Sequence, residues 1–131
     1  MDPIRPGAFS ISLAVADLAA SRRFYGTLGF EVAGGDADEH WLILRNSDAV
    51  IGLFEQMFDQ NILTFNPGLT QQAEPTDDFT DVRDVQAALR AAGYEPVLAT
   101  EPDGTGPAHV VVLDPDGNQV MVDQFVDRPG S

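Results

Sequence analysis

Histidine is a frequent metal ligand and proton carrier, and this sequence contains two, His40 and His109. They stand 69 positions apart, and each precedes a segment with the alternating pattern of a strand. This spacing would suit a metal site to which each of two similar halves contributes one ligand. Neither histidine, however, has a second histidine or a carboxylate at ligand spacing. The sequence therefore favours a structural or surface role for both side chains.

Other motifs that carry chemistry are missing from the sequence. Because there is no cysteine, disulfides, thiolate metal sites and cysteine nucleophiles are excluded. The segment Gly104-Thr105-Gly106 lacks the lysine of a phosphate-binding loop, and neither a nucleophile elbow nor a paired-carboxylate motif is present. Any chemistry must rely on oxygen, nitrogen or backbone groups.

The chain is strongly acidic, with 7 basic and 21 acidic residues and a net charge of −14. Such a surface repels nucleic acids and anionic lipids, so neither is an expected partner. The acidity could attract a cationic ligand, but a solvated acidic surface is the favoured interpretation. No apolar run is long enough to cross a bilayer, and the first residues lack the apolar stretch of a signal peptide. We expect a cytoplasmic protein.

An internal repeat predicts the elements that position the polar groups. Twelve positions separate Asp17 from Gly29 and again Asp81 from Gly93, and the two copies are offset by 64. Aspartate is a favoured helix N-cap, and glycine suits the left-handed position that ends a helix. Each copy therefore predicts one amphipathic helix. The apolar positions are Leu18, Phe24, Tyr25 and Leu28 in the first copy and Val82, Val85, Leu89 and Ala92 in the second.

Strands are predicted on both sides of each helix. Residues 9–15 alternate between large apolar and small side chains, which predicts a strand with one face against the helices. After each helix we expect a short strand, near Glu31 and near Tyr94, and then a hairpin that turns at residues 46–48 or 114–117. A length of 131 residues with 44% hydrophobic residues suits one domain, 1–131. Its two modules would span 8–55 and 61–126, joined by 56–60.

Several of these segments resemble one known family. Residues 11–18 (ISLAVADL), the pair Phe24-Tyr25, residues 28–30 (LGF) and residues 114–118 (DPDGN) are similar to the vicinal-oxygen-chelate superfamily of glyoxalase I, bleomycin-resistance proteins and extradiol dioxygenases. The resemblance covers nearly the whole chain. It implies an α+β fold in which two tandem βαβββ modules form a curled sheet around a pocket, usually in a homodimer. Members of the superfamily either catalyse reactions or only bind ligands, so the fold leaves the function open.

The resemblance also implies where a metal would be held. Metal-dependent members take histidine, glutamate or glutamine ligands from the first and last strands of each module. Transferred to this chain, three of the four positions fall on Ser10, Gly52 and Met121. A glycine has no donor atom, a hydroxyl is a weak ligand, and a thioether is too soft for an oxygen-rich site. We therefore expect no metal and no other cofactor.

The fourth ligand position depends on how the second module begins. Counting from the helix without a gap reaches Glu74, the fallback candidate for a metal ligand. The segment 74–79, with one proline and two aspartates, is a poor strand. Residues 61–65 (NILTF) have a better strand pattern, and this alternative makes Glu74 a loop carboxylate. The second alternative is favoured.

Strand alternation predicts which side chains line the pocket between the modules. The family-like geometry directs small, aromatic and a few polar side chains toward it, which suits an organic ligand held by stacking and a few directional contacts. The alternative is that the same side chains only fill a core. The candidate residues are Ser10, Ser12, Trp41, Arg45, Val50, Gly52, Phe54, Gln119, Met121 and Asp123.

Two functions remain as hypotheses. The favoured one is metal-free binding of a small organic molecule in this pocket, similar to bleomycin-resistance proteins. The alternative is a divalent-metal-dependent lyase, isomerase or dioxygenase resembling glyoxalase I, which would need Glu74 and a further ligand such as His109. A homodimer is expected, in which the apolar segments Met57-Phe58 and Ile62-Leu63 help to cover open sheet edges.

Overall fold

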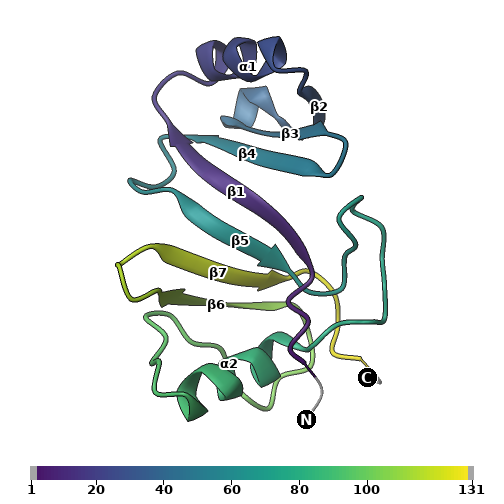
Figure 1. Cartoon of the computed structure of the whole chain (residues 1–131), viewed down its shortest axis with the longest axis vertical. Helices are drawn as coiled ribbons and strands as arrows, with labels where there is room; N and C mark the ends of the chain where they lie inside the picture. Colours follow the sequence, from purple (N-terminus) through teal and green to yellow (C-terminus); the bar gives the residue numbers. More distant parts are fainter. Residues whose placement is uncertain (1–2, 130–131) are drawn as a thin grey trace. The chain divides into compact units, whose positions relative to one another are not determined.

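The computed structural model describes residues 3–129, in which α-helices and β-strands form an α+β fold (Figure 1). The chain divides into two compact units. The first unit is Ser10–Leu63, and the second combines the segment that ends at Phe9 with the segment that begins at Thr64. Neither helix in the described part of the chain has the length and apolar character that a membrane span requires.

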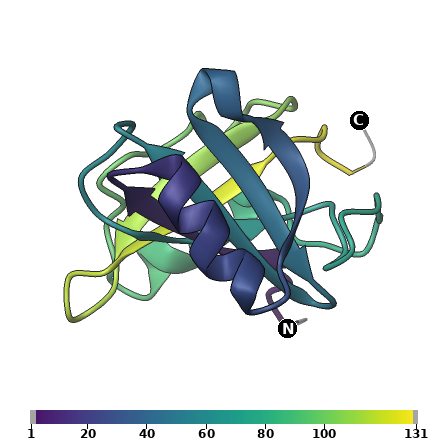
Figure 2. The same ribbon diagram turned by 90° about the horizontal axis from the view of Figure 1, so that it is seen from above.

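The first unit carries the complete βαβββ order that the sequence predicts. Along the chain come β1 (Ala8–Val15), α1 (Leu18–Thr27), β2 (Glu31–Asp36), β3 (Trp41–Asn46) and β4 (Ala49–Glu55), with a short 3₁₀ helix, η1 (Ala37–Glu39), before β3. The strand order is β2-β3-β4-β1, in which β1 runs parallel to β4 and the other pairs are antiparallel. Figure 2 shows α1 lying across one face of this sheet.

Helix α1 begins and ends where its sequence predicts. The Asp17 side chain caps it by accepting a hydrogen bond from the amide of Ala20 at 3.0 Å, and Gly29 follows the last turn with φ of +93°. Leu18 is buried in the apolar core of this unit. Two of the expected core positions are wrong, because Phe24 and Leu28 are 62% and 58% exposed. A helix of this length covers the sheet with one side only, and both residues lie outside that side.

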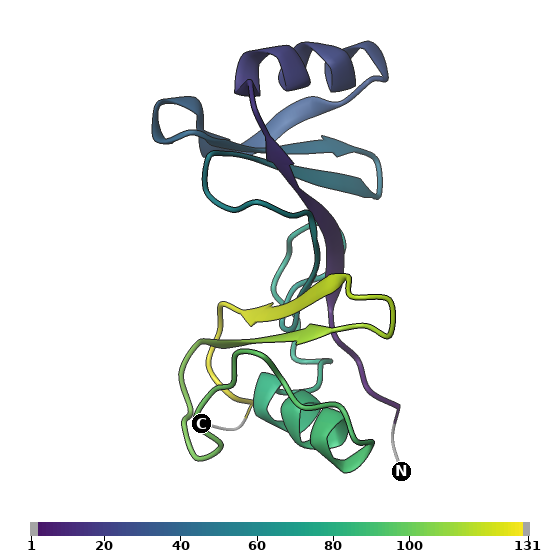
Figure 3. The same cartoon turned by 90° about the vertical axis from the view of Figure 1, so that its left-hand side faces the viewer.

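The second unit has a shorter arrangement of elements. It contains the part of β5 (Ile62–Asn66) that begins at Thr64, with α2 (Val82–Ala91), β6 (Ala108–Leu113) and β7 (Gln119–Gln124), in the strand order β5-β7-β6. Figure 3 shows α2 beside β6 and β7. The favoured strand at residues 61–65 is confirmed by β5.

The short strand expected near Tyr94 does not form. Instead, Leu98 makes a single isolated bridge to Val111. Pro96 follows Tyr94 and Glu95 and has no amide hydrogen, so it cannot donate to a strand ladder. The amides of Val97 and Leu98 both donate to the carbonyl of Val111, at 2.9 and 3.2 Å. The repeat in the sequence is thus more regular than the repeat in the fold.

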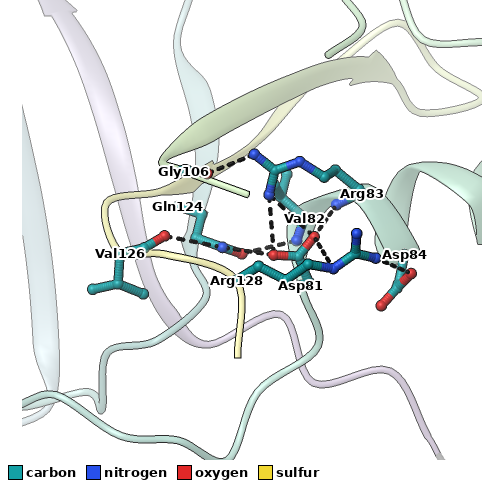
Figure 4. Close-up of polar contacts among 8 residues, drawn as sticks. All are labelled: Asp81, Val82, Arg83, Asp84, Gly106, Gln124, Val126 and Arg128. Carbon is teal, nitrogen blue, oxygen red and sulfur yellow. Dashed lines mark hydrogen bonds and ion pairs between the residues drawn. The ribbon is translucent and has the colours of Figure 1, made fainter. Parts of the chain in front are cut away.

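The start of α2 is held by a buried polar network (Figure 4). Asp81 is the N-cap, and its carboxylate accepts hydrogen bonds from the Arg83 amide at 3.0 Å and from Nε2 of Gln124 at 2.8 Å. The Arg83 guanidinium forms an ion pair with Asp81 at 3.2 Å and donates to the Gly106 carbonyl at 2.5 Å. The Gln124 side chain also accepts from the Val82 amide at 2.8 Å. These bonds join α2, β7 and the loop that contains Gly106.

Candidate ligand-binding site

In the first unit, one face of the sheet carries all the candidate residues that the sequence predicts for this half. In the strand register, Ser12 lies opposite Gly52 of β4, and Gly52 lies opposite Ile43 of β3. Because side chains alternate along a strand, the residues two positions away share this face. The candidates on it are Ser10, Ser12, Trp41, Arg45, Val50, Gly52 and Phe54. The opposite face carries Leu13 and Leu53, which pack in the core with Leu18 of α1.

The aromatic side chains of this face form a parallel pair. The rings of Trp41 and Phe54 are stacked with an interplanar angle of 3° and centroids 6.0 Å apart. Phe58 tilts against Phe54 at 5.3 Å. Gly52 provides the space for this arrangement, because a Cβ atom there would approach Cε2 of Phe54 to 2.6 Å. The face therefore offers flat apolar area next to the small side chain of Ser12.

In the second unit, the remaining three candidates lie together on β7. Gln119, Met121 and Asp123 share a face with their β6 partners Leu113, Val111 and His109. The other face of this hairpin packs against α2 through Val110 and Val122.

On this face of β7, Asp123 has a shifted pKa. Desolvation by burial raises the pKa of Asp123, and the nearby charge of His109 opposes the rise only in part. The Asp123 carbonyl accepts a hydrogen bond from Nδ2 of Asn66 at 2.9 Å, which connects β7 to β5.

Comparison with protein families matches residues 7–122 to the glyoxalase/bleomycin resistance protein/dioxygenase superfamily. The chain belongs to this superfamily. A search of curated protein sequences finds no significant match.

Solved structures of the superfamily share the fold at low sequence identity. A superfamily member from Vibrio splendidus 12B01 is 17% identical with a TM-score of 0.61, and the match covers 88% of this chain and 97% of that one. A Mn(II)-bound glyoxalase from Novosphingobium aromaticivorans is 22% identical with a TM-score of 0.57, covering 97% of this chain and 42% of that one. An extradiol ring-cleaving dioxygenase from B. fuscum is 22% identical with a TM-score of 0.56, and the match covers 97% of this chain and 33% of that one.

At the positions to which the resemblance transfers the superfamily's metal ligands, the side chains of this protein would fit a divalent ion poorly. They supply the hydroxyl of Ser10, the thioether of Met121 and no donor at Gly52. Glu74 lies in the loop after β5. Its carbonyl accepts a hydrogen bond from the Thr70 amide at 2.8 Å, and its amide donates to Oγ1 of Thr70 at 3.2 Å. Within residues 3–129, no three histidine, aspartate or glutamate side chains gather closely enough to hold a metal ion.

The structure also contains a polar pair that the sequence patterns did not predict. Nδ1 of His40 lies 3.0 Å from Oε1 of Glu55, although 15 positions separate the two residues. The hairpin register explains the contact, because Trp41 pairs with Phe54 and thereby places the residue just before β3 opposite the last residue of β4. Aligning the two strands of the hairpin from their turn would have predicted this pair.

Proposed function

We propose that this superfamily member binds a planar small organic molecule without a metal ion, against Trp41 and Phe54 on the first-unit face. The observation that carries the proposal is the parallel stack of these two rings. Aromatic rings lose little conformational entropy on binding and present a large apolar area to another flat ring. Ser12 is buried on the same face, and the absence of a side chain at Gly52 lets the Phe54 ring lie flat beside Trp41. We place the protein in the cytoplasm as part of this proposal.

The proposal is tested by fluorescence, because Trp41 is the only tryptophan of the chain. A panel of planar aromatic compounds should contain ligands that quench Trp41 emission, and catechol belongs in it because one similar structure is a catechol 2,3-dioxygenase. Phe54→Leu should weaken such a ligand about two- to tenfold, since an aromatic contact contributes about 0.5–1.5 kcal/mol beyond its buried area. Phe24→Leu, on the exposed side of α1, is the matched control and should leave the affinity unchanged.

The alternative function is a divalent-metal-dependent lyase, isomerase or dioxygenase. It is supported by similar structures that include a Mn(II)-bound glyoxalase and an extradiol dioxygenase. If the protein binds its ligand without a metal, manganese or ferrous ions alone should leave Trp41 emission unchanged in the same fluorescence experiment. They should also leave the melting temperature unchanged in thermal unfolding. A strong metal-dependent rise in melting temperature that Glu74→Ala removes would replace the binding proposal with the enzyme.

We further propose that the protein forms a symmetric homodimer. Exposed apolar side chains are present at the terminal strand β2, where Val32 is 42% exposed, and after β4, where Met57 is 50% exposed. Ile62, which we expected to contribute to this surface, is buried and does not. Light scattering at micromolar concentration should give the mass of two chains, and the mass of one chain would contradict the proposal.

A further inference from the structure

A hollow lies in the first unit, beside α1. It has a volume of about 540 Å³, within the usual range for small-molecule sites. Leu18 and Leu42 contribute apolar surface to it, and both belong to the core between α1 and the sheet. The polar side chains that line it are Asp17, Arg22, Arg23, His40 and Glu55. Since Trp41 and Phe54 point to the other face of the sheet, this hollow is separate from the proposed aromatic site.

The imidazole of His40 is held in place at the rim of this hollow. His40 ends η1 in the left-handed conformation with φ of +71°, which is uncommon for a residue with a side chain. Its carbonyl accepts a hydrogen bond from the Glu55 amide at 2.9 Å, and its Nδ1 contacts the Glu55 carboxylate at 3.0 Å. A carboxylate at Nδ1 orients the imidazole, and in the imidazolium form the Nε2–H group is left to donate to an anionic ligand.

Both carboxylates of the hollow are already engaged by the protein. Glu55 accepts a hydrogen bond from the Leu18 amide through Oε2 at 2.7 Å, and His40 contacts its other oxygen. The bond from the Leu18 amide, followed by that of His40, lowers the pKa of Glu55, so the group stays ionised. Asp17 accepts from the Ala20 amide at the start of α1. These bonds reduce the ability of the two carboxylates to attract a cation.

The two arginines of the hollow have no such partners. Within residues 3–129, neither Arg22 nor Arg23 has a carboxylate within 4.0 Å. This is unusual in a chain with 21 acidic and 7 basic residues. Four other arginines each form at least one ion pair: Arg5, Arg83, Arg90 and Arg128. Two guanidinium groups that line the same hollow without a carboxylate partner leave donors for an anionic ligand.

We propose that this hollow binds a small molecule through a phosphate group, which Arg22 and Arg23 contact with their guanidinium groups and His40 contacts through Nε2. A phosphate offers several acceptor oxygens and up to two negative charges, which match two guanidinium forks better than a single carboxylate does. The apolar surface of Leu18 and Leu42 would contact the remainder of the molecule. Because the overall charge of −14 repels anions, the attraction has to be local.

The test is a titration of the whole protein with inorganic phosphate at constant ionic strength, in which NMR monitors the backbone amide signals. The amides of Leu18, Arg22, Arg23 and His40 should shift together with one dissociation constant. The double variant Arg22→Gln/Arg23→Gln should weaken phosphate at least about tenfold, since charge-assisted bonds contribute about 1.5–3 kcal/mol each when formed well. His40→Gln should weaken it about threefold, in keeping with one exposed contact. Acetate should bind more weakly than phosphate.

The matched control is Arg5→Gln/Arg90→Gln, which removes the same charge from two exposed, paired arginines. It should change the phosphate affinity less than about twofold, because exposed charges at a distance are screened by salt. No shift of the named amides, or equal weakening in both double variants, would overturn the proposal. Phe54→Leu should leave phosphate binding unchanged. The phosphate site is therefore tested by the amide shifts and the aromatic site by Trp41 quenching, so that either proposal can fail without the other.

Discussion

Replacing Asp81 with asparagine is expected to lower the free energy of unfolding by about 3–5 kcal/mol at neutral pH, because it leaves a buried arginine without its counter-charge. The side chains of Asp81 and Arg83 are only 2% and 4% exposed, and their ion pair measures 3.2 Å. The same carboxylate accepts a hydrogen bond from Gln124 and caps α2. Chemical denaturation of the two proteins in urea measures the difference.

The matched control for this prediction is Asp78→Asn. Asp78 also pairs with an arginine, Arg5, at 2.7 Å, but the two side chains are 71% and 55% exposed. An exposed ion pair contributes about 0–1 kcal/mol, so the control should remain close to the unchanged protein. If both variants lose the same stability, the buried network is not what stabilises α2.

The difference in stability between the unchanged protein and Asp81→Asn should also depend on pH. Burial by itself would raise the pKa of Asp81, but the bonds from Gln124 and Arg83 outweigh burial and hold it below its ordinary value. A carboxyl group with a lowered folded-state pKa stabilises the fold above its unfolded-state pKa, and this stabilisation is lost as the pH falls through the folded-state value. The difference between the unchanged protein and Asp81→Asn should therefore shrink in strong acid. A difference that grows as the pH falls would contradict the assigned cause.

Gly7→Ala is expected to destabilise the protein by about 2–5 kcal/mol, from positive-φ strain of about 1–2 kcal/mol and overpacking of about 1–3 kcal/mol. Gly7 precedes β1 with φ of +89°. A Cβ atom there would come within 2.1 Å of the Asn66 carbonyl oxygen and 2.7 Å of Cα of Pro67. These are backbone atoms, which cannot move aside as the end of a side chain can.

Gly93→Ala separates the two contributions. Gly93 follows α2 with φ of +93°, but a Cβ atom at this position would meet nothing within 4 Å. This variant should therefore show only the strain of the left-handed conformation, about 1–2 kcal/mol. Thermal unfolding of both variants gives the comparison. Equal melting temperatures would show that the segment around Gly7 moves away from Asn66 at no cost.

Local chemistry made the secondary structure predictable. Asp17 and Asp81 cap the two helices and Gly29 and Gly93 follow them, because capping and left-handed conformations depend only on neighbouring residues. The turn with Gly117 at φ of +89° follows from the same kind of local preference. Alternation along each strand likewise placed the first-unit candidates on one face before any strand pairing was known.

The sequence by itself determined the helix ends, the turns, the strand faces and, through a resemblance, the superfamily. The tertiary structure alone decided which distant side chains meet. Gln124 of β7 reaches Asp81 at the start of α2 across 43 positions, and this contact has no short sequence signature. Tertiary packing also decided that Phe24 faces solvent. The physical reason is that caps and turns are satisfied within a few residues, whereas burial and charge pairing depend on which surfaces the folded chain brings together.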